Sequence, residues 1–189
     1  MIGPEIGKKE LPLEATKNEV LKEVNDTKEY ANKTSEWMGS DKENSDLGFI
    51  NPPSHHDENA DPKLDVLKYV IAGLVANDMD IFLSSFHPET VSKDMFKSKL
   101  EDKTKVAKAI MRKITRDGQI NDVNYKIEKG ALSSGTKNEL SVTITYKDNT
   151  HGIVKMEIIP LNDAHQHESI YVITTSSWEI IKQLKKTTR

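Results

Sequence analysis

The segment 61–86, DPKLDVLKYVIAGLVANDMDIFLSSF, is the most apolar part of a chain that is otherwise polar and charged. Asp61 followed by Pro62 is a favourable start for a helix. The pair Asn77-Asp78 interrupts the helical pattern, and His87-Pro88 ends a short second helix, because a residue before proline disfavours the helical region. A segment this apolar must be covered, so we expect a helical lid packed on a sheet.

One side of the predicted lid helix carries a stripe of large apolar residues at helical spacing: Leu64, Leu67, Ile71, Leu74 and Val75. Asp65 and Lys68 mark the narrow side that is left to water. Gly73 lies inside this helix and indicates the close approach of another element, or a kink.

The next predicted helix covers residues 91–116, and Phe96, Leu100, Ile110 and Ile114 belong to its buried face. Its other side is basic, since residues 93–117 contain nine Lys or Arg and four Asp or Glu. A surface ridge at helical spacing is formed by Lys105, Lys108, Arg112 and Arg116. Such a ridge suits an anionic partner, although an ordinary solvated face is the simpler interpretation. With Phe96 in the core, no aromatic residue accompanies the ridge, and we expect no nucleic acid partner.

After Gly118 the hydrophobic period changes from that of a helix to that of a strand. Alternating segments predict strands at 123–127, 140–146 and 153–161, and a fourth over 169–184 with a bend at Ser176-Ser177. Helices followed by antiparallel strands predict an α+β fold, with the N-terminal helices packed on one face of a curved four-stranded sheet.

The first 60 residues differ from the rest in charge and composition. They carry seven Lys and 13 Asp or Glu, whereas the remainder carries 20 Lys or Arg and 17 Asp or Glu. We interpret residues 1–60 as an acidic, mostly flexible arm with a helix at 17–38 and a linker at 39–60. The domain covers residues 61–184, and 185–189 form a basic tail.

The chain has no cysteine, which excludes disulfides, thiolate metal sites and cysteine nucleophiles. Its apolar runs are shorter than the roughly 18 residues of a membrane-spanning helix. No signal-peptide pattern opens the given sequence, and an anchor upstream of Met1 is compatible with it.

The predicted elements are a long helix, a short helix with a His-Pro turn, a third helix and an antiparallel sheet. This order resembles the nuclear transport factor 2-like (NTF2-like, cystatin-like) superfamily. The likeness covers residues 61–184 and is carried by 64–86, His87-Pro88-Glu89 and Trp178-Glu179-Ile180, which resembles the last strand of such domains. The resemblance implies a cone with a pocket between the first helix and the sheet. The superfamily includes isomerases and dehydratases, and non-enzymatic binding or assembly modules such as extracytoplasmic domains of conjugation and secretion scaffolds.

Pocket candidates are the aromatic and titratable residues at or near this lid: Tyr69, Asp80, Phe82, Phe86, His87, Tyr171 and Trp178. Asp80 and His87 could form an acid–base dyad, with Tyr69 or Tyr171 as a hydrogen-bond donor. The simpler interpretation is that Asp80 caps the short helix and His87 lies in a turn. We therefore assign no catalytic residue.

Two histidine pairs, His55-His56 and His165/His167, lie in predicted loops. Zinc needs three or four ligands, and no third ligand is indicated by spacing. We predict no metal and no cofactor.

These features predict a non-enzymatic NTF2-like binding or assembly module on a flexible arm, with a protein partner or self-association. The alternative is an NTF2-like enzyme that performs acid–base chemistry on a small hydrophobic molecule. Binding of a polyanion by the basic ridge ranks third. The resemblance also implies an extracytoplasmic location, membrane-associated or secreted, with the cytoplasm as the alternative.

Overall fold

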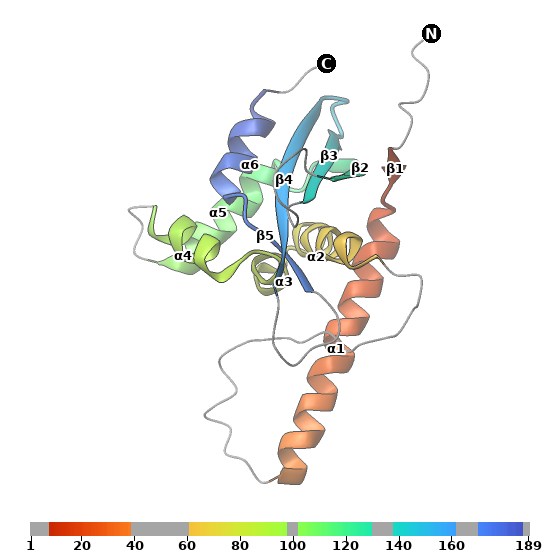
Figure 1. Cartoon of the computed structure of the whole chain (residues 1–189), viewed down its shortest axis with the longest axis vertical. Coiled ribbons are helices and arrows are strands. Elements are labelled where there is room, and N and C mark those ends of the chain that lie inside the picture. The colour runs from red at the N-terminus through yellow and green to blue at the C-terminus, as the bar shows by residue number, and fades with distance from the viewer. Residues whose placement is uncertain (1–7, 39–60, 98–101, 130–137, 162–169, 187–189) are drawn as a thin grey trace.

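The protein is α+β in a computed structural model that describes residues 8–38, 61–97, 102–129, 138–161 and 170–186. This confirms the predicted fold class (Figure 1). The elements in chain order are β1 (Lys9–Glu10), α1 (Leu13–Met38), α2 (Pro62–Ala76), α3 (Met79–Ser84), α4 (Pro88–Phe96), α5 (Lys103–Thr115), β2 (Ile120–Lys129), β3 (Asn138–Tyr146), β4 (His151–Leu161), β5 (Ile170–Ile173) and α6 (Ser177–Leu184).

The sheet has five antiparallel strands in the order β1-β2-β3-β4-β5, so the prediction of four strands was wrong. The additional strand is β1, which comes from the arm and pairs Lys9 with Tyr125 and Glu10 with Asn124 of β2. A strand of two residues is too short to produce a detectable alternation, because the period-2 signal needs several residues.

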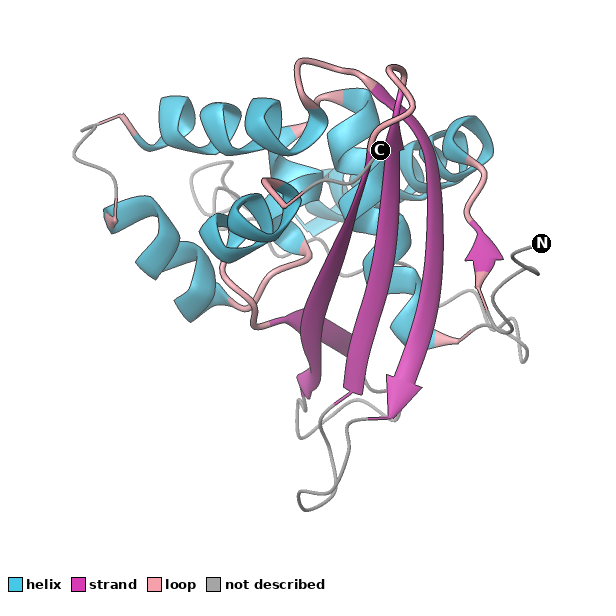
Figure 2. Cartoon of the chain, turned by 90° about the horizontal axis from the view of Figure 1, so that it is seen from above, coloured by secondary structure: helices cyan, strands magenta, loops and turns pink. Residues whose placement is uncertain are grey.

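The alternation predicted for the central strands is confirmed by their burial. The buried side chains on the inner face include Val123, Leu140, Val142, Ile144, Tyr146, Val154, Met156 and Ile158. Helices α2, α3, α5 and α6 contribute apolar side chains to the same core, and Figure 2 shows the helices gathered against the curved strands.

The predicted boundaries of the lid are confirmed. The Asp61 carboxylate accepts the N–H of Lys63 at 3.0 Å, and Pro62 occupies the first turn of α2. Asn77 ends the helix in the left-handed conformation with φ of 54°. Asp78 then caps α3 by accepting the N–H of Ile81 at 3.1 Å. The Asn77-Asp78 pair therefore ends one helix and starts the next.

Gly73 is the point of close approach that the sequence indicated. A Cβ atom placed on Gly73 would lie 2.5 Å from the backbone nitrogen of Phe82 and 2.8 Å from its Cα. Only glycine fits here, because α3 folds back onto α2 with its backbone nearly in van der Waals contact.

The predicted helix over 91–116 is two helices, and the placement of Phe96 in the core was wrong. Asp102 starts α5, and its carboxylate accepts the N–H of Thr104 at 3.0 Å. Phe96 ends α4 and is 74 % exposed. Asp94 and Met95 take the inward positions of α4, and a residue two places after Asp94 lies more than half a turn away from it. Leu100 lies outside the described residues.

The predicted fourth strand over 169–184 was wrong in its second half. Strand β5 ends at Ile173, and Ser176 caps helix α6 by accepting the N–H of Trp178 at 3.2 Å. The spacing of Ile180, Ile181 and Leu184, all buried in α6, is helical. Trp178, expected in a last strand, therefore belongs to a helix.

Helix α1 starts at Leu13, four residues earlier than predicted, and its first half is packed. Val20 and Val24 are 1 % and 2 % exposed and form a second small core with Ala72 and Ile81. The second half of α1 projects beyond the rest of the molecule (Figure 1). The expected linker at 39–60 lies outside the described residues, so the boundary at residue 60 stays a prediction.

Substituting Gly73 by alanine should destabilise the protein by about 1–3 kcal/mol or more, because the new methyl group would overlap the Phe82 backbone. Urea unfolding followed by circular dichroism measures this loss. Gly118→Ala is the comparison. Gly118 has open space around it and a φ of +80°, so only backbone strain of about 1–2 kcal/mol is expected there. A Gly73→Ala protein as stable as wild type would contradict the close approach.

Candidate functional site

Among the described residues, side chains fill most of the space beneath the lid. In the described interior we find an apolar void of about 20 Å³ there. It is lined by Val70, Ile71, Leu74, Phe82, Ile114, Val142, Ile144, Val154, Met156 and Ile180. A void of this size has room for about one water molecule, whereas small-molecule sites typically span about 300–1,000 Å³.

Phe82 and Phe86 are the two pocket candidates that the structure brings into ring contact. Their centroids are 5.1 Å apart with an interplanar angle of 63°, an edge-to-face arrangement. They are 0 % and 3 % exposed, so both rings belong to the core. Phe86 also forms a bridge with Ile173, which attaches the α3–α4 connection to strand β5.

Asp80 and His87 lie at the rim of the lid in structural positions. Asp80 is exposed in the first turn of α3, and Asp78, not Asp80, caps that helix. His87 caps α4, where its Nδ1 accepts the N–H of Glu89 at 3.2 Å. The backbone N–H of His87 donates to the Ile173 carbonyl at 2.9 Å. The imidazole nitrogen that caps the helix is thus occupied by a backbone hydrogen bond.

Tyr69 faces helix α1. Its hydroxyl donates to the Glu23 carboxylate at 3.0 Å, and the ring packs beside Val20, Val24 and Ala72. Burial raises the pKa of Tyr69, and the Glu23 charge and hydrogen bond raise it further. Tyr69 therefore joins the arm to the lid.

Lysine ammonium groups lie over Tyr171 and Trp178. Lys63 Nζ is 5.8 Å from the Tyr171 ring centroid in β5, and Lys113 Nζ is 5.1 Å from the Trp178 ring in α6. Both rings are partly buried beside the core. Their faces serve packing and cation–π contacts.

A buried carboxylate that the sequence analysis did not single out joins α4 to α6. Asp94 is 3 % exposed, and its two carboxylate oxygens accept the Ser176 hydroxyl at 2.5 Å and the Ser177 N–H at 2.7 Å. Trp178 Nε1 donates to the Asp94 carbonyl at 3.0 Å. An acidic residue in a basic stretch is ordinarily expected to be exposed to solvent. The sequence pattern therefore did not indicate this junction.

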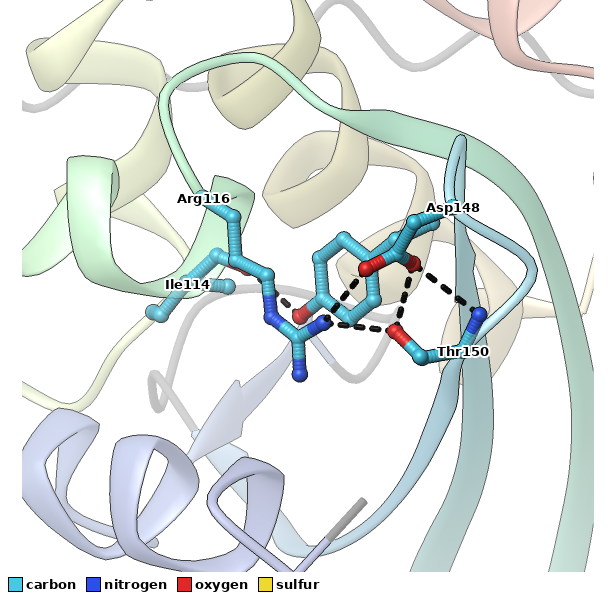
Figure 3. Close-up of polar contacts among 5 residues, drawn as sticks. Ile114, Arg116, Asp148 and Thr150 are labelled. Atoms are coloured by element: carbon cyan, nitrogen blue, oxygen red, sulfur yellow. Dashed lines mark hydrogen bonds and ion pairs between the residues drawn. The ribbon is translucent and has the colours of Figure 1, made fainter. Parts of the chain in front are cut away.

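A second polar junction joins the end of α5 to the β3–β4 hairpin (Figure 3). The Arg116 guanidinium lies 3.8 Å from the Tyr146 ring centroid and donates to the Thr150 hydroxyl at 2.7 Å. The buried Tyr146 hydroxyl donates to the Ile114 carbonyl at 2.8 Å. Hydrogen bonds from the Thr150 hydroxyl and N–H, assisted by Arg116, lower the pKa of Asp148. This arrangement holds the hairpin against the helix.

The basic ridge is divided by that junction. Lys105, Lys108 and Arg112 are exposed on α5. Arg116 is partly buried, has a left-handed φ of 50°, and directs its guanidinium to the hairpin. Three of the four ridge residues therefore remain open to a partner in solution.

Phe96 and four lysines form what we name the α4–α5 corner, defined by Lys93, Phe96, Lys97, Lys103 and Lys105. Lys103 Nζ lies 4.5 Å from the Phe96 ring centroid and donates to the Met95 carbonyl at 3.1 Å. Lys93, Lys97 and Lys105 are exposed. This cluster was not predicted from the sequence, because Phe96 was expected in the core.

Among the described residues, no group of three or more His, Asp or Glu is arranged to hold a metal ion. Both histidine pairs, at 55–56 and at 165 and 167, lie outside them. No helix of the described ranges is long and apolar enough to cross a membrane.

Comparison of the chain with protein-family models, curated proteins and solved structures gave no match.

Replacing Asp94 by alanine should lower the free energy of unfolding by about 2–4 kcal/mol, because the buried Ser177 N–H loses its acceptor. Asp94→Asn should cost less, since its amide oxygen can still accept that hydrogen bond. The matched control is the exposed carboxylate variant Asp80→Ala, with an expected change within about 1 kcal/mol. Denaturant unfolding measures all three. Equal losses of unfolding free energy in Asp94→Ala and Asp80→Ala would contradict the stabilising role of the Asp94 junction.

Stability should fall as the pH rises above about 10, the ordinary value for tyrosine. Burial raises the pKa of Tyr146, with a smaller opposing effect of Arg116, so the folded state keeps its phenol proton at a pH where the unfolded state has released it. The contribution of the Tyr146 proton to stability is complete at pH values below the pKa of tyrosine in the unfolded chain. It is lost as the pH rises through the higher pKa of Tyr146 in the folded protein. Tyr146→Phe should make the alkaline decline shallower in pH-dependent urea unfolding. A decline equally steep in the variant would contradict this account.

Proposed function

We propose that this protein is a non-enzymatic binding or assembly module of the NTF2-like (cystatin-like) type, which acts through its surface. The observation that carries the proposal is the filled interior. The space in which such a domain would hold a small molecule contains an apolar void of about 20 Å³. Titratable groups at its rim cap helices, as His87 does, or face water, as Asp80 does.

The arrangement of the lid supports the NTF2-like part of the proposal. Helix α2 packs on the inner face of the sheet, α3 returns across it, and a His-Pro turn leads into α4. The chain departs from the family pattern at its end, where the residues that resemble a last strand, Trp178-Glu179-Ile180, form part of α6. This departure puts the Trp178 part of the resemblance in doubt.

Two features support an assembly role. The first half of α1 covers α2 through Val20 and Val24, so the described arm is a packing element. Its second half extends away from the domain (Figure 1) and offers a helix to a partner or a second copy. The extracytoplasmic location stays a prediction that rests on the resemblance.

The alternative, an enzyme with acid–base chemistry beneath the lid, requires an open pocket and a titratable group inside it. All ten side chains that line the void are apolar. This observation favours the binding module over the enzyme.

Two substitutions at one wall of the void test the proposal. Val154 lines the void and is 1 % exposed. Val154→Ile should fill the void and change stability by less than about 1.5 kcal/mol, while Val154→Ala should enlarge it at a cost of about 1–3 kcal/mol. Thermal-shift and NMR titrations with small hydrophobic aromatics, such as indole and benzene, should detect no stoichiometric binding to wild type or to Val154→Ile. Weak binding to Val154→Ala would serve as the positive control.

A wild-type protein that bound such a probe stoichiometrically, and lost it in Val154→Ile, would contradict the proposal and support the pocket alternative. Self-association is measured separately by sedimentation equilibrium of the full chain.

A further inference from the structure

We propose that the α4–α5 corner docks on the surface of an anionic lipid bilayer, with Phe96 as the apolar anchor and the surrounding lysines as the electrostatic contact. This goes beyond the proposed function, because it concerns exposed side chains of α4 and α5 outside the lid and names a different class of partner. It does not depend on the interior being filled.

The apolar anchor is the phenyl ring of Phe96, which is exposed to solvent. Phe96 is 74 % exposed, more than the other exposed large apolar residues of the described chain, Ile153 at 47 % and Leu161 at 39 %. Those two lie in strand β4, away from the corner. An exposed phenyl ring gains free energy on leaving water, and phenylalanine is a common apolar contact of interfacial membrane-binding segments.

The position of the ring is imposed by the fold. Asp94 is tied to Ser176 and Ser177 of α6, and Met95 is packed in the main core. These contacts fix the rotation of α4, so the next residue, Phe96, must point outward. The ring is thus presented at the end of a helix whose orientation is anchored from inside.

Lysines lie on both helices of the corner. Lys93, Lys97 and Lys105 are exposed, and Lys103 holds its ammonium 4.5 Å from the ring centroid. Lysines beside an apolar anchor are attracted to anionic headgroups by about 1 kcal/mol each near a cytoplasmic-type surface.

The acidic neighbours do not cancel this charge. Glu89 lies 3.8 Å from Lys93, and the exposed Asp102 carboxylate accepts the N–H groups of Thr104 and Lys105. Asp94 is buried against α6. Among the described residues of the corner, four lysines are therefore accompanied by two exposed carboxylates, and Lys108 and Arg112 continue the positive face along α5.

The shape of the corner favours a bilayer over the other anionic partners. A single protruding ring needs a preformed hollow in a protein partner, whereas a bilayer adapts to it. Stacking on nucleic acid uses the face of a ring, and Lys103 already lies over the Phe96 ring. We therefore commit to a lipid surface, and treat the other two as outcomes of the test.

The test is co-sedimentation of the full chain with phosphatidylcholine vesicles, with and without phosphatidylserine. Binding is expected only with phosphatidylserine and should weaken as salt is raised. Phe96→Ala should reduce the partition coefficient about tenfold. Lys93→Gln together with Lys97→Gln should reduce it about 30-fold. Phe96→Trp should retain binding, because it keeps an interfacial aromatic group.

The controls use the same residue types elsewhere on the surface. Ile153→Ala removes another exposed apolar side chain, and Lys147→Gln with Lys186→Gln removes two exposed lysine charges. Both should bind vesicles like wild type, and circular dichroism should show every variant folded.

Absence of vesicle binding, equal binding to both kinds of vesicle, or equal losses in the control variants would each overturn the proposal. So would Phe96-dependent binding to a poly-glutamate or duplex DNA probe without binding to vesicles. A negative result here leaves the void test at Val154 unaffected, so the two proposals fail separately.

Discussion

The close contact between Gly73 and the backbone of Phe82 is the constraint on which the rest of the structure depends. Because glycine has no Cβ atom, α3 returns tightly across α2 and delivers Phe82 to the main core and Ile81 to the smaller core beneath α1. Helix α2 is then covered on one side by the sheet and on the other by α1. Between this closely packed lid and the sheet, the described residues leave a void of about 20 Å³.

The proposed function places binding at the surface, and buried polar junctions orient the helices that form this surface. Asp94 ties α4 to the start of α6, and Arg116 and Tyr146 tie the end of α5 to the hairpin. These contacts connect residues that are 30 or more positions apart in the chain. They set the rotation of each helix, and hence decide that Phe96 is presented outward among lysines while Met95 is packed inside.

Predictions from the sequence succeeded where the signal was local and failed where it depended on distant partners. The cap at Asp61 is a side chain bonding to the backbone two residues away, so it could be recognised, whereas the cap of α3 was assigned to Asp80 and is Asp78. The positions of the pocket candidates were predicted less accurately. Phe82 lines the void, whereas Tyr69 turns to α1, because the choice of face depends on which helix covers the lid. The break before Asp102 was itself a local signal, and overlooking it misplaced Phe96.

The sequence by itself determined the α+β class, the two-part lid and the alternation of the three long strands. Each of these follows from periodicity or from backbone chemistry within a few residues. Only the tertiary structure decided that β1 joins the sheet, that Gly73 is the point of close approach to α3, and that Asp94 is inside while Phe96 is outside. Those outcomes are set by contacts between segments remote in sequence, which no local pattern contains.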